Sequence, residues 1–419
     1  MRAVAIASPP WADLPEDPEA LFARILDWHR RGDDLVRLYH QLRAVAPVWR
    51  APVERLGRPW VITRHADASQ LVRDTSLVKD ARTIGMAGVG GGGPWIQILL
   101  RMFAFQPKEP HARMRGLVNR GFTPRSIEQL RPRVQALVDE LIDAVIDEGS
   151  MDLVSQFAFR VPVTVISQML GAPLEDVPRI ERWSGDFARR SDEGAALTPE
   201  VEKMGDEAAT EFAAYLDELI AARRARPADD LLTRLLEVQR EAPDLTDADI
   251  ASTVILLFQA GHETTANLIA KGSLALIRNP DEAERLRRDP SLIERATEEL
   301  LRYDTPVQLT TKFATKPIPF HDRTIEPGDP VSFIWGAINR DPEHFADPDR
   351  LDLGRTNLDH YSFGMGANYC LGANLARLEI QHSIETLFRR IPGLRLGEGE
   401  IVYKPQLHLH GLARLPVAW

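Results

Sequence analysis

The segment over residues 245–278 does most to limit the folds open to this chain. Thr246 is placed to cap the amino end of a helix, Asp249 follows three residues later, and the pair Asn279-Pro280 ends it. The pattern predicts a helix of about 32 residues, roughly 48 Å long at the α-helical rise. Because residues 250–258 are apolar nearly all round, we expect this helix to be buried through the middle of a large domain.

Polar residues 259–265 interrupt the apolar surface of the same helix. Burying them costs free energy unless they are paired or face a wet cavity, and Gly261 is about 1 kcal/mol less favourable than alanine in a helix. Two interpretations stay open: a functional site, or a local kink in which Thr264 bonds back to a carbonyl one turn earlier. A zinc-protease motif starting at His262 is excluded because position 266 is alanine.

The rest of the chain predicts further helices, at 126–148 and 198–226, with β-rich parts near 48–64 and 310–334. No repeat or linker divides the sequence. We therefore expect a mainly α fold with small β-sheets, in one domain over residues 1–419. The Gly-rich stretch 88–93 lacks the Lys-Ser/Thr of a phosphate-binding loop and is interpreted as a flexible loop.

The composition excludes some classes of protein. Hydrophobic residues make up 44% and charged residues 27%, as in folded proteins, and the formal net charge of −10 argues against a nucleic-acid partner. Residues 1–21 contain no apolar core, so we expect neither a signal peptide nor a membrane anchor, and a cytoplasmic location.

The only cysteine, Cys370, excludes an internal disulfide and zinc sites built on several thiolates. It lies at the end of a Gly-rich loop, 363–372, immediately before an apolar-periodic helix. Backbone amides at a helix start can point at a sulfur, and the helix dipole favours an anion there. The loop therefore favours a thiolate held for a metal, while a structural cysteine beside a turn remains the alternative.

Several motifs together resemble the cytochrome P450 family, and they occur in the order and spacing of that family across nearly the whole chain. They are the heme loop (Phe363, Gly364, Gly366, Cys370, Gly372), the central-helix motif (Ala260, Gly261, Glu263, Thr264), the Glu-x-x-Arg pair (Glu299, Arg302) and the His-x-x-x-Arg of bacterial members (His111, Arg115).

The resemblance implies a triangular P450-type fold with the long central helix over heme b. Cys370 would be the axial thiolate ligand of the iron. Thr264 and Glu263 would form the proton-delivery pair above the iron. Glu299 and Arg302 would be a buried structural pair that orders the cysteine side of the heme.

The resemblance also implies the residues around the heme. They are His111, Arg115, Ala260, Gly261, Lys312, Phe363, Gly364, Asn368, Cys370 and Gly372. Asn368 stands where the family usually has His or Arg, and Lys312 where it usually has Arg. We therefore hypothesise weaker neutralisation of the heme propionates and a more negative heme potential than in relatives with the full set.

The activity implied is insertion of one oxygen atom from O2 into a hydrophobic small organic substrate, by hydroxylation or epoxidation. A separate ferredoxin with its reductase would supply the electrons, since no cluster-binding cysteines or flavin fingerprint occur in the chain. Two alternatives are a peroxygenase driven by hydrogen peroxide and a non-catalytic heme-thiolate sensor. The intact pair Glu263-Thr264 argues against both.

Family topology implies which residues surround the substrate, and they are mainly apolar. They are Leu256, Ala260, Val307, Gln308, Leu309 and Leu407. The loop from Ile84 to Phe105 is expected to form a lid over this pocket, and the segment from Arg189 to Pro199 to join the helices of its entrance.

Overall fold

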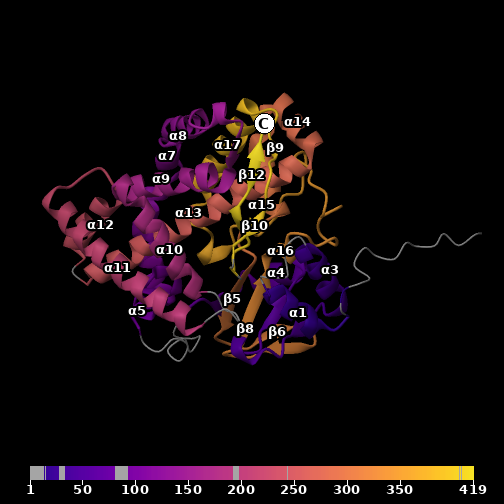
Figure 1. Ribbon diagram of the computed structural model, residues 1–419. Coiled ribbons are helices and arrows are strands. Elements are labelled where there is room, and N and C mark those ends of the chain that lie inside the picture. The colour runs from indigo at the N-terminus through magenta and orange to yellow at the C-terminus, as the bar shows by residue number, and fades with distance from the viewer. Residues whose placement is uncertain are drawn as a thin grey trace, which may run out of the picture.

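The fold is mainly helical, as a computed structural model shows for residues 14, 16–27, 34–80, 93–191, 198–242, 244–404, 406 and 408–419 (Figure 1). The helices of the described residues are α1 (Pro18–Leu26), α3 (Leu35–Val45), α4 (His65–Leu71), α5 (Pro94–Arg101), α6 (Lys108–Asn119), α7 (Pro124–Glu128), α8 (Arg131–Asp143), α9 (Arg160–Leu170), α10 (Val177–Ser191), α11 (Pro199–Ala225), α12 (Leu231–Glu241), α13 (Asp247–Arg278), α14 (Pro280–Arg288), α15 (Ile293–Tyr303), α16 (Trp335–Ile338) and α17 (Ala373–Arg390).

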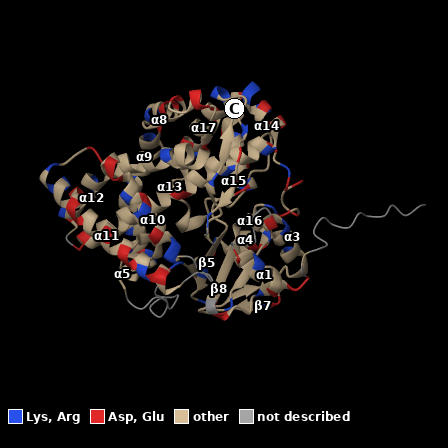
Figure 2. Ribbon diagram, in the orientation of Figure 1, with Lys and Arg blue, Asp and Glu red and all other residues tan. Residues whose placement is uncertain are grey.

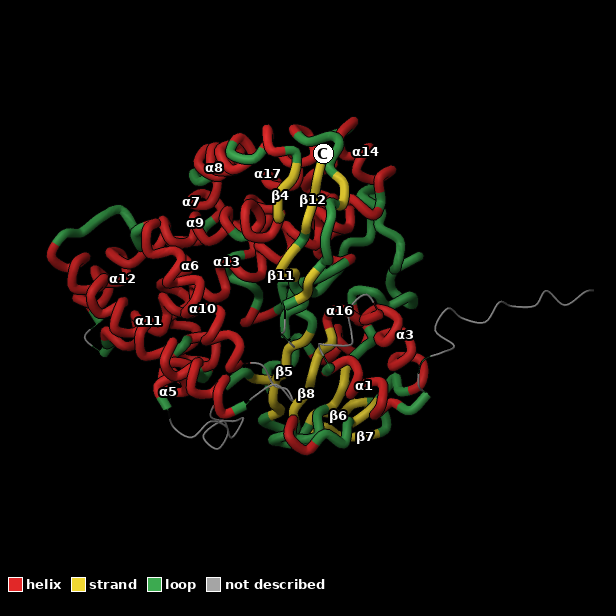
Figure 3. The backbone as a smooth tube through the Cα atoms, in the orientation of Figure 1, coloured by secondary structure: helices red, strands yellow, loops and turns green. Residues whose placement is uncertain are grey.

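The strands form small sheets that lie between helices on either side in the view of Figure 3, with β12 near the top and β8 near the bottom. The largest has the order β1-β2-β8-β5-β3, with β2 and β8 parallel and the other neighbours antiparallel. Its strands are β1 (Trp49–Arg50), β2 (Trp60–Ile62), β3 (Leu77–Val78), β5 (Leu309–Ala314) and β8 (Pro330–Ile334). The remaining strands are β4 (Ser150–Asp152), β6 (Ile318–Phe320), β7 (Arg323–Ile325), β9 (Arg395–Leu396), β10 (Val402–Tyr403), β11 (Leu412–Arg414) and β12 (Pro416–Ala418). The expected fold class and both β-rich parts are confirmed.

The long helix predicted from the sequence is α13, which runs through the centre of the molecule (Figure 1). Thr246 and Asp249 form a reciprocal capping box at its start, so two backbone amides that lack helical partners are satisfied. Most of its residues are buried, and it packs against α9, α11 and α17. None of the helices in the described residues is long and apolar enough to cross a membrane.

The helix expected over 126–148 is divided in the structure. Helix α7 ends at Glu128 and α8 begins at Arg131, with Pro132 in the first turn of α8. Proline is tolerated in a first turn but interrupts a continuing helix, so the chain starts a new one there. The carboxyl end is a 3-10 turn that stops before Gly149, whose φ is 71°.

The main hydrophobic core lies among the helices and includes side chains from α13 and α17. A smaller core lies between α1, α3 and the five-stranded sheet, and a third packs the other side of that sheet against Tyr361. Acidic and basic residues are mixed over the outer helices in the view of Figure 2. The segment between Asn339 and Gly372 is mostly irregular and carries the cysteine loop to the start of α17.

Candidate active site

A cavity of about 360 Å³ lies between α13, α17, β5 and the cysteine loop. Cys370 lines it from the loop, and Ala260, Gly261 and Thr264 line it from the middle of α13. The polar part of the long helix and the single cysteine therefore line the same cavity. Thr265 and Cys370 are 105 positions apart in the chain.

Two glycines and one backbone hydrogen bond shape the cysteine loop. Gly364 and Gly366 have φ values of 67° and 71°, in the left-handed region that favours glycine. The amide of Cys370 donates to the carbonyl of Phe363 at 2.9 Å, which closes the loop. Burial raises the pKa of the Cys370 thiol, while the Gly372 amide bonded to the sulfur and the nearby Arg115 favour the thiolate. A cation at the sulfur would complete its deprotonation.

The two polar residues of the central-helix motif point to different places. Thr264 lines the cavity, and its hydroxyl donates to the carbonyl of Ala260 at 3.0 Å, one turn earlier. Glu263 is buried and is not among the residues that line the cavity. Its carboxylate accepts hydrogen bonds from Lys404 Nζ at 3.2 Å and from Gln406 Nε2 at 2.8 Å.

The partners of Glu263 decide its charge. Burial raises the pKa of this carboxyl, but Lys404, His262 and Gln406 together outweigh burial, so the pKa lies below its ordinary value. Glu263 is therefore ionised at neutral pH, and Lys404, which the sequence did not single out, holds it in that state.

Basic side chains also line the cavity. His111, Arg115 and Lys312, all expected from the sequence, line it together with Lys79, which sequence reasoning missed. Asn368 lines it as well. Burial and, to a smaller extent, repulsion by Lys79 together lower the pKa of Lys312 to about 8. The pKa of Lys79 is lowered by burial too.

The charges of Lys79, Arg115 and Lys312 are opposite in sign to those of the heme propionates. In the described part of the chain no ion pair joins Lys79, Arg115 or Lys312 to a carboxylate. Positive groups gathered in a cavity without counter-ions favour an anionic ligand. Heme carries two propionates, and a cysteine sulfur in the same cavity can bind its iron. The residues present therefore fit heme.

The expected pair Glu299 and Arg302 lies in the interior with both side chains fully buried. It is bidentate, with Nε to Oε2 at 2.7 Å and the second guanidinium nitrogen to Oε1 at 2.9 Å. Arg355, which sequence reasoning missed, donates to Glu299 at 3.1 Å. Arg302 also donates to the carbonyls of Asn339 and Pro348, so the network holds the segment before the cysteine loop.

The residues expected around the substrate divide into two groups. Leu256, Ala260 and Val307 line the cavity, whereas Gln308 and Leu309 do not. Side chains alternate along a strand, so Leu309 packs into the core beside α1 and α3, on the face of β5 opposite to Lys312. The prediction for Leu309 was wrong because it did not apply this alternation, and the prediction for Gln308 was wrong because hydrogen bonds hold that side chain elsewhere.

Gln308 is held away from the cavity by hydrogen bonds with Tyr39 and Thr305. Thr310, on the cavity face of β5, takes the place that the sequence assigned to Leu309. Leu407 lies outside the described residues, as do 84–92 of the expected lid and 192–197 of the expected entrance segment. The described rest of the lid forms α5 and a short turn, and Phe103 and Ala104 of that turn line the cavity.

Glu379 of α17 is a further cavity residue that sequence reasoning missed. It is fully buried, neither carboxyl oxygen has a hydrogen-bond partner, and burial raises its pKa well above the ordinary value. A signal was present in the sequence, since an acidic residue stands between Leu378 and Ile380 on the apolar side of the helix.

Comparison with known proteins gives consistent matches. The sequence profile of the family described as cytochrome P450 matches residues 98–391. Cytochrome P450 CYP107DY1 of Priestia megaterium is 37% identical over 374 residues, with 86% of this chain and 90% of that protein covered. The 6-deoxyerythronolide B hydroxylase of Saccharopolyspora erythraea is 34% identical over 403 residues, with 92% and 96% covered.

A solved structure of P450BioI, in complex with an acyl carrier protein ligated to hexadec-9Z-enoic acid, has a TM-score of 0.87. It is 33% identical, and 92% of this chain and 98% of that chain are covered. The profile spans well over half of the chain, and the relatives are similar along nearly all of it. The chain belongs to the cytochrome P450 family, and it is a monooxygenase with heme b as its cofactor.

Proposed function

We propose that the chain inserts one oxygen atom of O2 into a C–H or C=C bond of a hydrophobic small organic molecule. A separate ferredoxin and its reductase would supply the two electrons. The observation that carries the proposal is the shared cavity, in which Cys370, Thr264 and a largely apolar wall meet. We also propose that residues 1–419 act as one domain in the cytoplasm, where the Cys370 thiol stays reduced.

Heme b bound to the Cys370 thiolate supplies the iron centre for O2 activation. His111, Arg115, Lys79 and Lys312 would hold its propionates from the charged part of the cavity. Ala260 and Gly261 on α13 present little or no side chain to the cavity, so a flat ring can lie close to this helix. Gly364 likewise has no side chain, so a flat ring can also lie close to the cysteine loop.

Protons would reach the reaction site along α13. The Thr264 hydroxyl lies in the cavity, where it can position water. Glu263 precedes it in the sequence, and its carboxylate is paired with Lys404, the more exposed of the two side chains. We propose that the carboxylate takes up a proton on the Lys404 side and passes it to Thr264 through water after leaving that ion pair.

The substrate class rests on the wall of the cavity. Leu256, Leu257, Val307, Phe103 and Ile166 contribute apolar surface, which favours a hydrophobic molecule. Relatives carry names that fit this class: one acts on 6-deoxyerythronolide B, and a solved neighbour holds a fatty acyl chain. A peroxygenase is less consistent with the site, because peroxide brings its own protons and would not need Thr264 and Glu263.

The first test is the carbon-monoxide difference spectrum of the reduced protein, measured for the parent and for Cys370→Ser. We expect the Soret band that defines the family in the parent and its absence in the variant, because only a thiolate ligand gives that band. A parent that binds heme but lacks the band would contradict Cys370 as the ligand. Turnover with hydrogen peroxide but not with O2, ferredoxin and reductase would contradict the proposed reaction.

A further inference from the structure

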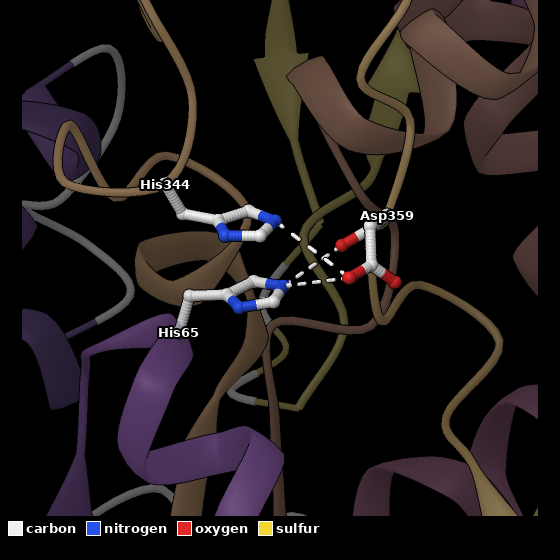
Figure 4. Close-up of side chains that lie close together, drawn as sticks. All are labelled: His65, His344 and Asp359. Carbon is white, nitrogen blue, oxygen red and sulfur yellow. Dashed lines mark hydrogen bonds and ion pairs between the residues drawn. The ribbon is translucent and has the colours of Figure 1, made fainter.

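A group of metal-binding side chains lies apart from the heme cavity, where three segments of the chain meet (Figure 4). His65 is the first residue of α4, His344 follows α16, and Asp359 lies in the segment that leads to the cysteine loop. Each offers one ligand atom, and all three atoms lie within 4.8 Å of one another. Within the described residues this is the one group of three or more His, Cys, Asp or Glu side chains that meets this spacing.

The two imidazole rings are stacked in parallel, with centroids 3.4 Å apart and an angle of 6° between the planes. Both Nε2 atoms point to the same side, toward Asp359 (Figure 4). Asp359 Oδ2 lies 3.8 Å from His65 Nε2 and 3.7 Å from His344 Nε2. His65 is buried, whereas the side chain of Asp359 is 60% exposed, so the group is open to solvent on the carboxylate side.

Two further side chains fix the backbones that carry the three groups. Buried Asp341 accepts the backbone amide of His65 at 2.7 Å through its carboxylate, and the amide of His344 at 3.1 Å through its carbonyl. Asn357 donates to the carbonyl of His344 at 3.0 Å and accepts from the amide of Asp359 at 3.3 Å. The backbones of the three segments are therefore held together by hydrogen bonds to Asp341 and Asn357.

His344 Nε2 has no hydrogen-bond partner although it is inaccessible to solvent. A buried polar nitrogen without a partner is rare, and it indicates an unfilled interaction.

We propose that His65, His344 and Asp359 bind one divalent transition-metal ion of the zinc class, with water as the fourth ligand. Zinc prefers imidazole nitrogen and carboxylate oxygen at about 2.0–2.1 Å, so tetrahedral ligand atoms lie roughly 3.3 Å apart. The observed nitrogen-to-oxygen distances of 3.7 and 3.8 Å are only a few tenths of an ångström longer.

Binding requires two small changes in the group. Imidazole lone pairs lie in the ring plane, so the two rings must turn from their parallel stack toward the shared ion, and the partly exposed His344 has room to do so. His65 Nε2 lies 2.9 Å from the carbonyl of Asp359, and this contact must open so that the nitrogen faces the ion. Through His65 and Asp359 the ion would then connect α4 to the segment that leads to the cysteine loop.

The test is a calorimetric titration of the heme-loaded protein with zinc chloride at pH 7.5, after treatment with a chelator. We expect one ion per chain, and at least tenfold weaker binding in His344→Ala and in Asp359→Asn. His382→Ala is the matched control, because His382 is a partly buried histidine of α17 that bonds to Gln135 and Arg131 instead. The control should bind zinc as the parent does.

Heme content and the carbon-monoxide spectrum show whether each variant is folded. If His344→Ala loses heme, Asp359→Asn carries the test alone, since its side chain is mostly exposed. Anomalous scattering at the zinc edge from a soaked crystal should place the ion between the two rings. The proposal is wrong if zinc does not bind stoichiometrically, if both cluster variants bind it like the parent, or if the ion lies elsewhere.

Discussion

Glu263 illustrates at the residue scale how a partner from a distant segment sets the state of a buried acid. Burial alone would raise the pKa of the carboxyl, and Lys404, 141 positions away, is the largest cause that lowers it. Thr264, its neighbour in sequence, instead bonds to its own helix and faces the cavity. The proposed relay therefore depends on how readily the ion pair with Lys404 opens.

Changes at this ion pair should alter proton delivery. We expect Glu263→Gln to lower the rate of product formation on the order of 100-fold, because the amide cannot carry the proton. Lys404→Met should raise the pKa of Glu263, since burial then acts without its largest opposing charge. The pH profile of product formed per NADH should move toward higher pH in this variant, with Lys404→Arg as the control that keeps the charge. A Glu263→Gln variant with the parent rate would exclude the relay.

Lys312 should make heme retention depend on pH. Its pKa is about 8 in the protein without heme, and a bound propionate would raise it, so heme binding is linked to proton uptake. The contribution of Lys312 to heme affinity is complete below pH 8 and is lost as the pH rises through the heme-bound pKa. We expect heme transfer to apomyoglobin to accelerate between pH 8 and pH 10 (about tenfold per unit of pKa shift).

Lys312→Arg is the control for this effect. Arginine stays charged over the whole range, so its transfer rate should depend less on pH than that of the parent. Parallel curves for the two proteins would show that Lys312 does not neutralise a propionate.

At the scale of elements, the contact between α9 and α13 explains the glycine in the middle of the long helix. A β-carbon added at Gly261 would lie 2.9 Å from Cγ1 of Ile166 on α9, closer than real contacts allow. The sequence indicated a site because of the unfavourable glycine. The structure adds a packing reason, since the two helices approach closely at the level of the cavity that Gly261 also lines.

This contact predicts opposite effects of one substitution in two backgrounds. Gly261→Ala should destabilise the parent by about 1 kcal/mol, because crowding of roughly 2 kcal/mol exceeds the gain of about 1 kcal/mol in helix propensity. In an Ile166→Ala background the same change should stabilise by about 1 kcal/mol. Urea unfolding of the four proteins measures both effects, and an equal effect in both backgrounds would contradict the steric explanation.

At the scale of the whole molecule, the buried network of Glu299, Arg302 and Arg355 joins α15 to the irregular chain before the cysteine loop. Arg302 donates to carbonyls at positions 339 and 348, and the amide of Asp352 donates to Glu299 at 3.0 Å. A long segment without regular structure needs such contacts, because its backbone groups have no helix or sheet partners. The position of Cys370 in the cavity wall therefore depends on the buried charges of Glu299, Arg302 and Arg355.

Breaking this network should affect the entire protein. Arg302→Lys keeps the charge but loses the bidentate geometry and the bonds to carbonyls, so we expect a loss of about 3–5 kcal/mol of stability and a low heme content. Arg288→Lys is the control, because its pair with Glu284 is exposed, and no measurable loss is expected there. Normal heme content in Arg302→Lys would show that the network does not position the cysteine loop.

The sequence by itself determined the elements whose signals are local. The cap at Thr246, the apolar run that follows it and the stop at Asn279 define α13, and the spacing of Glu299 and Arg302 places them on one helix face. The glycines and the cysteine of the loop are likewise neighbours in the chain. Capping, periodicity and short motifs act within a few residues, so they can be recognised before the fold is known.

Only the tertiary structure decided which side chains meet across distant segments. Lys79 reaches the cavity from the position after β3, Lys404 pairs with Glu263 from beyond α17, and Thr310 replaces Leu309 because strand register sets which face is buried. The stacked pair of His65 and His344 is likewise separated by 279 positions in the chain. Burial, pairing and pKa depend on these long-range contacts, and no local pattern encodes them.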